Sequence, residues 1–494
     1  MELKVKILNW SAGIPVAMLN ESTANLIGVK TNGRIFIQTL SKNPKSISTI
    51  VDTAKTLVGK KEIAVSSELK ERLSLTRGQK VDIDLSSNPK SLTLIKKKMN
   101  NKELSQKEIS EIIFDITQNS LSDAEIALFI SAMYDKGMNM KETIYLINAI
   151  LNSGQKLKWK GGLVADKHSI GGIPGNRTTP LVVSICAAGG LIMPKSSSRA
   201  ITTAAGTADV IETIAKVEFS MKELKKIVEK TGACLIWGGS LEIVPADEKI
   251  ITIEKMLNID PESQLLASIM SKKLALGANY ILIDIPYGKT AKVDKKKGNN
   301  LKRKFEYLGK YFKRKVHVVL TKGDEPIGNG IGPVLEILDI LKILKRSENR
   351  ALDLEKKSIF LAGQIFEMTK KAKKGQGIKL AKELLDSGKA LKKFGEIIKA
   401  QGGTLDHLKP AKFRKDIIAK KNIKIQEIDN KKINSLARIS GSPLDKSAGL
   451  YLYGHIGDKI NKGEKIITIY SESKSRLKES IHFFNSQKPI KFRH

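Results

Sequence analysis

The sequence predicts a multidomain α/β protein, and three observations support this prediction. The chain has 494 residues, more than one typical domain contains. Its hydrophobic pattern changes from strand-like alternation to helical spacing near residue 98, and a later apolar segment lies between two Gly/Ser/Thr-rich loops. The predicted parts are a small N-terminal β-barrel-like domain (1–88), a helical domain (98–160) joined by a later segment (247–275), a central α/β domain (161–414) and a C-terminal α+β domain (415–494).

The N-terminal segment is expected to be rich in β-structure. Leu3 and Val5 alternate with lysines, which is typical of a half-buried strand. Two turns, Asn32-Gly33 and Arg77-Gly78, each precede a strand-like run. Both halves of the segment consist of a short helical stretch, a turn and a strand, so we expect an internally duplicated small barrel. It contains no catalytic candidates.

The next segment has the spacing of amphipathic helices. Ser105 with Glu108, and Ser122 with Glu125, form potential capping boxes before apolar runs on one face. A third helix is expected to stop near Gly154. The excess apolar surface of such a domain could form a subunit interface or close a purely intramolecular bundle, and the sequence leaves both open.

The stretch from Asp166 to Glu212 carries the strongest functional signal. It opens with Lys167, His168 and Ser169 followed by glycines, and it closes with serine, arginine, threonine and glycine from Ser196 onward. The apolar segment between these loops is long enough to cross a core, so the loops should face one another. Backbone N–H groups, hydroxyls and cations together make a phosphate site. The alternative is two ordinary Gly/Ser loops of an α/β protein.

Later segments add further candidates. Residues 247–274 have a helical pattern, in which Ser268 and Lys272, at i and i+4, share a face. A strand at 280–285 ends in a third loop, 286–292, and ligands of open α/β sheets bind at such carboxyl ends. The C-terminal domain resembles a lipoyl-type hairpin without a lysine-bearing tip, so we expect it to be structural.

Composition limits the class of protein. There is no stretch of about 18 apolar residues, and the chain begins with alternating charge, so neither a membrane span nor a signal peptide is expected. Cys186 and Cys234 lack a CxxC or histidine partner. We expect both to be buried thiols in a reducing cytoplasm, and we expect no metal site.

The formal net charge of +35 raises the question of nucleic-acid binding. The excess is mostly lysine, scattered along the whole chain with few aromatic residues between. This pattern is typical of a solvated lysine surface, which would also steer a phosphorylated substrate to its site. Specific nucleic-acid binding is therefore not expected.

Two motifs resemble those of a known family. KHS-x-GG at 167–172 and SSSRAITTAAGTADVIE at 196–212 are similar to the signature region of the thymidine phosphorylase and AMP phosphorylase family of nucleoside and nucleotide phosphorylases. The resemblance extends over most of the chain, and the N-terminal segment is similar to an extension found in the archaeal-type AMP-cleaving members. It implies a homodimer through the helical domain, or a larger homo-oligomer.

The resemblance implies phosphorolysis of a nucleoside 5′-monophosphate, in which AMP and phosphate give adenine and ribose 1,5-bisphosphate. Such a reaction has a transition state with oxocarbenium character. It needs phosphate beneath C1′, a proton for the departing base and a cationic site for the 5′-phosphate. Phosphate is a co-substrate, and no cofactor, metal or covalent enzyme intermediate is required.

The family's binding positions can be carried over residue by residue. Those that hold phosphate match Lys167, Ser169, Thr179, Ser197 and Thr207, with Thr178 as the alternative to Thr179. Those that contact the nucleotide match Gly172, Ser198, Arg199, Ala200, Ile201, Thr202, Thr203, Thr207, Ser268 and Lys292. Lys272 is a secondary candidate because it keeps the family's residue type.

Asp260 matches the family's general acid, which must carry a proton when the reaction begins. The alternative role of Asp260 is a helix N-cap before Pro261, and the two roles are compatible. His168 could contact the base, polarise its departure or orient a loop. Pyrimidine-specific members place an arginine where this chain has Ile253, which favours a purine nucleotide.

Three other functions are alternatives for this sequence. The nearest is a pyrimidine nucleoside (thymidine) phosphorylase. An enzyme like anthranilate phosphoribosyltransferase would need Mg²⁺ on adjacent acidic residues, and no convincing Asp-Glu pair lies near this core. A non-catalytic, basic nucleic-acid-binding or adaptor protein on the same scaffold is the third. The preference among AMP, CMP and UMP stays open.

Overall fold

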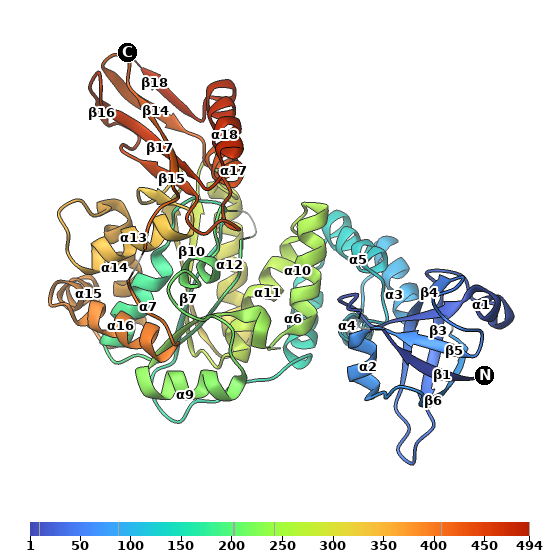
Figure 1. The fold of residues 1–494 in the computed structure, drawn as a ribbon. Coiled ribbons are helices and arrows are strands. Elements are labelled where there is room, and N and C mark those ends of the chain that lie inside the picture. The colour runs from blue at the N-terminus through green and yellow to red at the C-terminus, as the bar shows by residue number, and fades with distance from the viewer. Residues whose placement is uncertain (9, 87, 201–202, 242, 407, 494) are drawn as a thin grey trace. The chain divides into compact units, whose positions relative to one another are not determined.

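The computed structural model describes residues 1–8, 10–86, 88–200, 203–241, 243–406 and 408–493 (Figure 1). Its contacts divide the chain into two compact units. The first comprises Met1–Gly154 and Val244–Ser268, and the second comprises Gln155–Ile243 and Ile269–His494. Each unit is described by itself.

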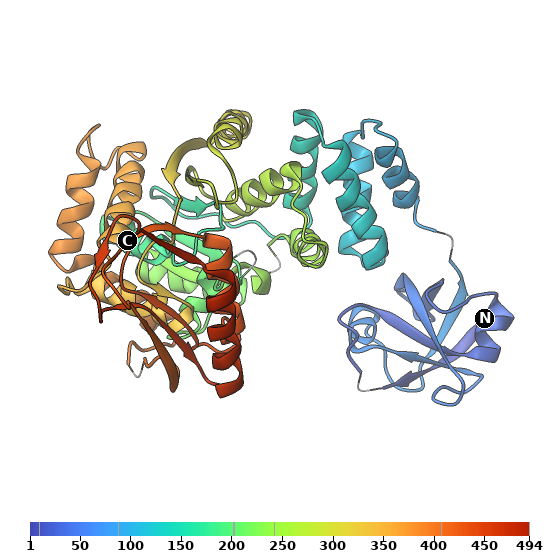
Figure 2. The same ribbon diagram turned by 90° about the horizontal axis from the view of Figure 1, so that it is seen from above.

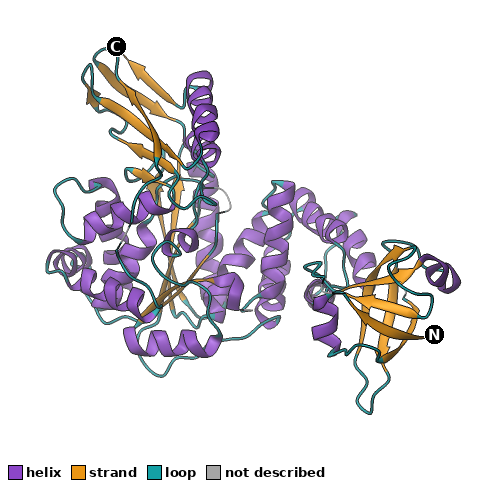
Figure 3. Cartoon of the chain, in the orientation of Figure 1, coloured by secondary structure: helices purple, strands orange, loops and turns teal. Residues whose placement is uncertain are grey.

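The first unit begins with a closed β-barrel of strand order β1-β5-β2-β4-β3-β6, shown in orange in Figure 3. Leu3 and Val5 point into its core, because alternate side chains of a strand share a face. Helices α1 and α2 begin at the N-caps Asn20 and Ser66 and precede β3 and β6, so the small barrel is confirmed and its halves have the expected order. The elements are β1 (Glu2–Ile7), β2 (Val16–Asn20), α1 (Glu21–Ile27), β3 (Arg34–Thr39), β4 (Ser46–Ala54), β5 (Glu62–Val65), α2 (Ser67–Leu73) and β6 (Lys80–Leu85).

A helical bundle completes the first unit. The capping boxes predicted at Ser105 and Ser122 are present, and Asn139 forms another. The barrel is attached to the bundle by Arg34, whose Nε donates to Ser120 O at 3.0 Å. The helices are α3 (Lys90–Met99), α4 (Gln106–Thr117), α5 (Asp123–Lys136), α6 (Met140–Asn152), α10 (Pro245–Leu257) and α11 (Glu262–Ala275), of which α11 continues into the second unit.

The second unit contains the α/β domain. A parallel sheet of order β11-β10-β7 and a parallel pair β8-β9 are packed by helices around one apolar core. The strands are β7 (Ala165–Ser169), β8 (Met193–Ser197), β9 (Ala233–Trp237), β10 (Tyr280–Tyr287) and β11 (Lys315–Lys322). The helices are α7 (Thr178–Ala188), α8 (Thr207–Ile211), α9 (Met221–Thr231), α12 (Lys295–Tyr311), α13 (Pro333–Leu344), α14 (Leu352–Met368), α15 (Gly377–Asp386) and α16 (Lys389–Ala400), with a 3₁₀ turn at Gly238–Leu241.

One local prediction is wrong. Lys167, His168 and Ser169 were expected to open a loop, but they end strand β7. The reason is pairing with β10, in which Ser169 lies opposite Asp284. Their side chains are therefore positioned by a sheet, and the loop that follows begins at residue 170.

The C-terminal domain has its own apolar core between sheets of order β12-β15-β17-β13 and β16-β14-β18. Figures 1 and 2 show its helices, in red, lying against its strands. Strand β12 belongs to the glycine-rich turn after β11, and its Ile331 pairs with Leu450 of β15. The elements are β12 (Gly330–Ile331), β13 (Phe413–Ile418), β14 (Ile423–Ile428), α17 (Asn430–Ser440), β15 (Gly449–Leu452), β16 (Lys459–Ile460), β17 (Lys465–Ser471), α18 (Lys474–Gln487) and β18 (Ile490–Arg493).

Two predictions from composition can be compared with the fold. Cys186 and Cys234 are free and buried, as expected. In the described part of the chain, the helices are too short or too polar to span a membrane.

Candidate functional site

Strand β7 carries a buried lysine at its carboxyl end. Lys167 is 0 % exposed, and its Nζ donates to Thr178 Oγ1 at 2.6 Å and to Thr179 Oγ1 at 3.5 Å. Burial lowers the pKa of the Lys167 ammonium to about 7; Asp284 opposes this shift, and the charge of Lys357 adds to it. An anion bound beside Lys167 would restore its full charge. Thr178 thus lies nearer to the lysine than the predicted Thr179.

The Ser169 hydroxyl is oriented by a buried carboxylate. Ser169 Oγ donates to Asp284 Oδ2 at 2.7 Å, and Thr321 Oγ1 donates to Asp284 Oδ1 at 2.6 Å. Lys357 Nζ lies 3.0 Å from the same carboxylate. Burial alone raises the pKa of Asp284, but the charges of Lys357 and Lys167 outweigh burial and hold it below its ordinary value. The carboxylate is therefore ionised, and it fixes the direction of Ser169.

His168 is surrounded by cationic side chains. Burial lowers the pKa of its imidazole well below the ordinary value, and the charges of Lys273 and Lys195 lower it further. Both lysines are themselves paired with Asp166, at 2.8 Å and 3.3 Å. His168 is therefore neutral at pH 7, so one ring nitrogen can donate and the other can accept a hydrogen bond.

The second loop meets the first through an arginine. Arg177 donates to Thr207 Oγ1 at 2.9 Å and to Ala205 O at 2.8 Å, and its Nε pairs with Glu336 at 2.5 Å. Arg177, at the end of the first loop, thereby links that loop to Ala205 and to the predicted phosphate ligand Thr207 through one buried guanidinium. Within the described residues, the buried Ser197 Oγ has no hydrogen-bond partner. A buried hydroxyl without a hydrogen-bond partner is suited to bind a ligand.

The second loop is closed by Asp209, whose Oδ2 accepts from Ala200 N at 2.7 Å and Gly206 N at 2.8 Å. The loop is tight at this point. A Cβ on Gly206 would lie 2.4 Å from Ser198 O, so glycine is required there. Gly206 and Ser198 are consequently held in close contact.

Arg199 lies at the outer side of this loop. Its guanidinium donates to both carboxylate oxygens of Glu212 at 2.7 Å and to Glu218 at 3.0 Å, and it stacks over Trp237 at 4.7 Å. These glutamates raise its pKa above the ordinary value. Arg199 is thus part of an ion-pair cluster, and its contact with a nucleotide stays a prediction. Ile201 and Thr202 lie outside the described residues.

The third loop lies against the first. Gly172 has φ +104°, and a Cβ there would lie 3.2 Å from both the backbone N and the Cβ of Lys292. This close approach requires glycine and places the predicted nucleotide contacts Gly172 and Lys292 side by side. The described residues of three loops of the second unit, 170–177, 198–200 with 203–206, and 288–294, therefore form one cluster, which we call the loop cluster.

The remaining predicted residues lie on or before α11. Asp260 and Ser268 belong to the first unit, and Lys272 lies one turn further on in the second. Ser268 Oγ donates at 2.9 Å to the buried Asp247, which also accepts from Gln264 at 2.9 Å. The expected shared face of Ser268 and Lys272 follows from the helix between them.

Three charged residues of the second unit belong to this region and were not predicted from the sequence. Asp284 interrupts an otherwise apolar strand, which was a usable signal because a charge in a buried strand needs a partner. Arg177 stands beside the two threonines at the start of α7. Lys357 gave no local signal, because it is one of several lysines on α14 and its partner lies on β10.

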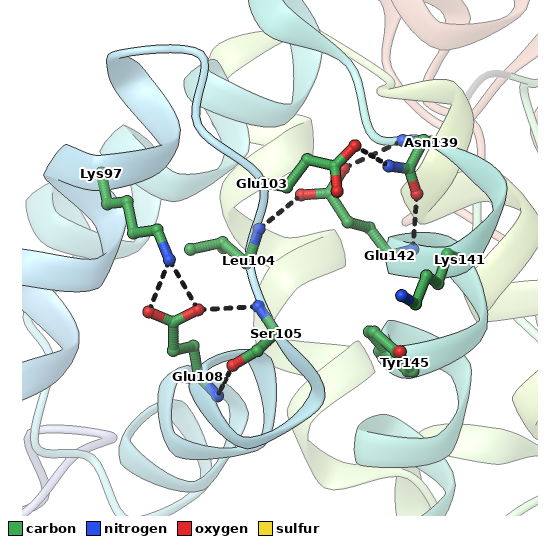
Figure 4. Close-up of a pocket in the computed structure, with 9 residues that line it drawn as sticks. All are labelled: Lys97, Glu103, Leu104, Ser105, Glu108, Asn139, Lys141, Glu142 and Tyr145. Carbon is green, nitrogen blue, oxygen red and sulfur yellow. Dashed lines mark hydrogen bonds and ion pairs between the residues drawn. The ribbon is translucent and has the colours of Figure 1, made fainter.

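A cavity of about 250 Å³ lies in the helical bundle of the first unit (Figure 4). Its carboxylates are occupied: Glu108 accepts from Lys97 at 2.7 Å, and Glu142 pairs with the buried Lys98 at 2.8 Å. The lining therefore consists of helix caps and ion pairs of the bundle. It comprises Lys97, Glu103, Leu104, Ser105, Glu108, Asn139, Lys141, Glu142 and Tyr145. Among the residues that the structure describes, no group of three or more His, Cys, Asp or Glu could hold a metal ion.

Comparison with protein families gives three matches along the chain. Residues 92–154 match the helical bundle domain of the glycosyl transferase family, and residues 161–391 match its α/β domain. Residues 424–491 match the pyrimidine nucleoside phosphorylase C-terminal domain. The matched regions coincide with the bundle, the α/β core and the C-terminal sheets.

Proteins named AMP phosphorylase are similar to this chain over nearly its whole length. Those of Methanococcus aeolicus and Methanococcoides burtonii are each 40% identical, over 99% of this chain and 97% of their own length. That of Thermococcus kodakarensis is also 40% identical, over 99% of this chain and 98% of its own. Among solved structures, anthranilate phosphoribosyltransferase from Thermus thermophilus has a similar fold, with TM-score 0.52, 18% identity and coverage of 63% of this chain and 99% of that one.

Proposed function

Since the chain belongs to the AMP phosphorylase family, within the glycosyl transferase family, we propose that it cleaves AMP with inorganic phosphate to adenine and ribose 1,5-bisphosphate. The observation that carries the proposal is the loop cluster beside Lys167 and Ser197. There a buried cation, small hydroxylated residues and a closely curved backbone come together, as an anion site requires.

In this proposal the attacking phosphate is bound by Lys167, Ser169, Ser197 and Thr207, with Thr178 or Thr179 beside the lysine. The ammonium gains charge as the anion arrives, because a nearby negative charge favours the protonated form. Thr207 accepts from Arg177, which leaves its own proton for the phosphate. The single proton of Ser169 is donated to Asp284, so Ser169 presents its lone pairs to the protonated oxygen of HPO₄²⁻. Preorganised donors of this kind reduce the reorganisation needed in the transition state.

The nucleotide is proposed to contact Gly172, the run from Ser198 to Thr203, Ser268 and Lys292, with Lys272 nearby. Asp260 donates the proton that the adenine needs as its bond to C1′ breaks. The neutral His168 supplies a further hydrogen bond to the base or to the loop. Phosphate is the co-substrate, and the proposal includes no cofactor.

The test is release of free base by the purified protein. Adenine should appear from AMP only when inorganic phosphate is present, together with an equal amount of ribose 1,5-bisphosphate. Adenosine, thymidine, CMP and UMP serve as comparison substrates. Faster cleavage of adenosine or thymidine than of AMP would contradict the assignment to nucleotides.

Asp260→Asn tests the general acid. It should lower kcat by about 10²- to 10⁴-fold, the usual contribution of general acid catalysis, with less effect on the KM for AMP. Glu262→Gln, two residues further along at the start of α11, is the matched control and should retain activity. A near-normal kcat for Asp260→Asn would reduce Asp260 to a helix cap.

A further inference from the structure

One face of α17, in the C-terminal domain, contacts the loop cluster. Asn430, Asn434 and Arg438 follow at intervals of four residues, so they lie along one side of the helix. Asn430 is 0 % and Asn434 is 6 % exposed. Polar groups buried to this extent are retained where they are hydrogen-bonded, so their partners indicate their role.

Asn434 joins the first two loops through a single amide group. Its Oδ1 accepts from Ala204 N at 3.0 Å, and its Nδ2 donates to Gly172 O at 3.3 Å. The bridge needs one acceptor and one donor at a fixed separation, which an asparagine side chain provides. An aspartate cannot donate, and a serine is too short to reach both partners.

Asn430 and Arg438 extend the contact to either side. Asn430 Nδ2 donates at 3.0 Å to Thr290 Oγ1 in the third loop and at 3.0 Å to Gly323 O. Arg438 donates to Thr203 O in the second loop at 3.1 Å. One helix face therefore contacts each loop of the cluster.

The helix is itself fixed to the α/β domain. Ala204 of the second loop packs in the apolar core of the C-terminal domain, together with Ile433 and Leu436 of α17. The strand pair β12–β15 ties the glycine-rich turn to the same domain through Ile331 and Leu450. The described residues of these loops form no helix and only an isolated bridge at Val293, so this helix supplies their common support.

We propose that α17 is the positioning element of the substrate site, and that Asn434 sets the separation between the first loop, which connects the proposed phosphate ligands Ser169 and Thr178, and the nucleotide-binding second loop. The C-terminal domain thereby takes part in substrate binding without touching substrate. This inference rests on the proposed function for the identity of the substrates, but the support of the loops by α17 does not depend on which nucleotide is cleaved.

The test compares Asn434→Asp with Ser435→Ala, a control at the next, exposed position whose hydroxyl donates to Lys431 O within α17. Loss of the bridge should raise the KM for phosphate and for AMP together, each by about tenfold, as expected when a buried hydrogen bond is lost. Asn430→Asp should raise the KM for AMP and leave that for phosphate unchanged. A purely structural role would lower Tm without moving either KM.

Normal KM values for both substrates in Asn434→Asp would overturn the inference. A second readout uses inorganic phosphate alone: it should raise the Tm of the wild type and fail to do so for Asn434→Asp. If the wild type does not cleave AMP, the proposed function fails, but the Tm measurement still tests the inference about α17. An increase in the Tm of Asn434→Asp by phosphate equal to that of the wild type overturns the inference. If Asn434→Asp does not fold, Arg438→Gln replaces it in the test, because Arg438 is exposed. This variant must raise the KM for AMP, and an unchanged KM refutes the inference.

Discussion

The buried Lys167 predicts a link between phosphate binding and protonation. Lowering its pKa from an ordinary 10.5 to about 7 makes its charged form about 5 kcal/mol less favourable in the fold than in water, at about 1.4 kcal/mol per pH unit. A bound phosphate anion offsets this cost. Above pH 7 phosphate binding must therefore be accompanied by uptake of a proton, and the KM for phosphate should rise about tenfold per pH unit.

The same shift determines how stability depends on pH. The unfolded chain keeps the Lys167 proton up to about pH 10.5, whereas the folded protein releases it near pH 7. Because the unfolded state binds more protons in this window, stability from this group rises as pH increases from about 7 to about 10.5. Lys167→Met removes the buried charge, so it should raise Tm at pH 7 in phosphate-free buffer and abolish the pH-dependent rise in phosphate KM.

The assay measures initial rates of base release against phosphate concentration between about pH 6 and pH 10, together with Tm in phosphate-free buffer. Lys160→Met, which removes an exposed lysine of the same unit, should behave as the wild type. A wild-type phosphate KM that stays constant from pH 7 to pH 9 would refute the reasoning. So would a Lys167→Met variant that retains the pH dependence.

Three further predictions concern the charges around the site. Asp284→Asn leaves Lys357 buried without its counter-ion, so it should cost about 3–5 kcal/mol of unfolding free energy in chemical denaturation; a loss below about 1 kcal/mol contradicts the pairing. Arg177→Lys replaces a forked donor by a single ammonium, which cannot reach Glu336, Thr207 and Ala205 O together. The KM for phosphate should then rise about tenfold, as for a lost charged hydrogen bond, and an unchanged KM would show that the link between the loops is dispensable. Finally, the net charge of +35 should steer anionic substrates to the protein. The kcat/KM for AMP should therefore fall severalfold as ionic strength rises from about 0.01 M to about 0.15 M, because the Debye length shortens from about 30 Å to about 8 Å. A kcat/KM that does not change with salt excludes steering.

Much of the fold was predictable because its signals are local. Capping boxes at Ser105 and Ser122, the alternation around Leu3 and the helical spacing of the bundle each involve residues within a few positions of one another. Such patterns depend on helix and strand geometry alone. The error at Lys167 to Ser169 has a non-local cause, since pairing with β10 extended the strand through polar residues.

The candidate site was predictable to a smaller extent. The motifs around the first two loops predicted which residues would bind anions, because lysine, serine, threonine and glycine near one another are suited to phosphate. Their partners could not be predicted in this way. Ser169 and Asp284 are 115 positions apart, and Gly172 and Asn434 are 262 apart. Contacts over such separations depend on strand register and domain packing.

The sequence by itself determined the class of chemistry: a basic composition, motifs suited to binding phosphate and membership of a family of phosphorolytic enzymes. Tertiary structure alone decided how that chemistry is organised. It made Lys167 a buried cation with a pKa near 7, made Asp284 the carboxylate that orients Ser169, and placed the loops on one face of α17. The physical reason is that charge state and orientation depend on burial and on partners distant in sequence, whereas residue type and spacing are properties of the local chain.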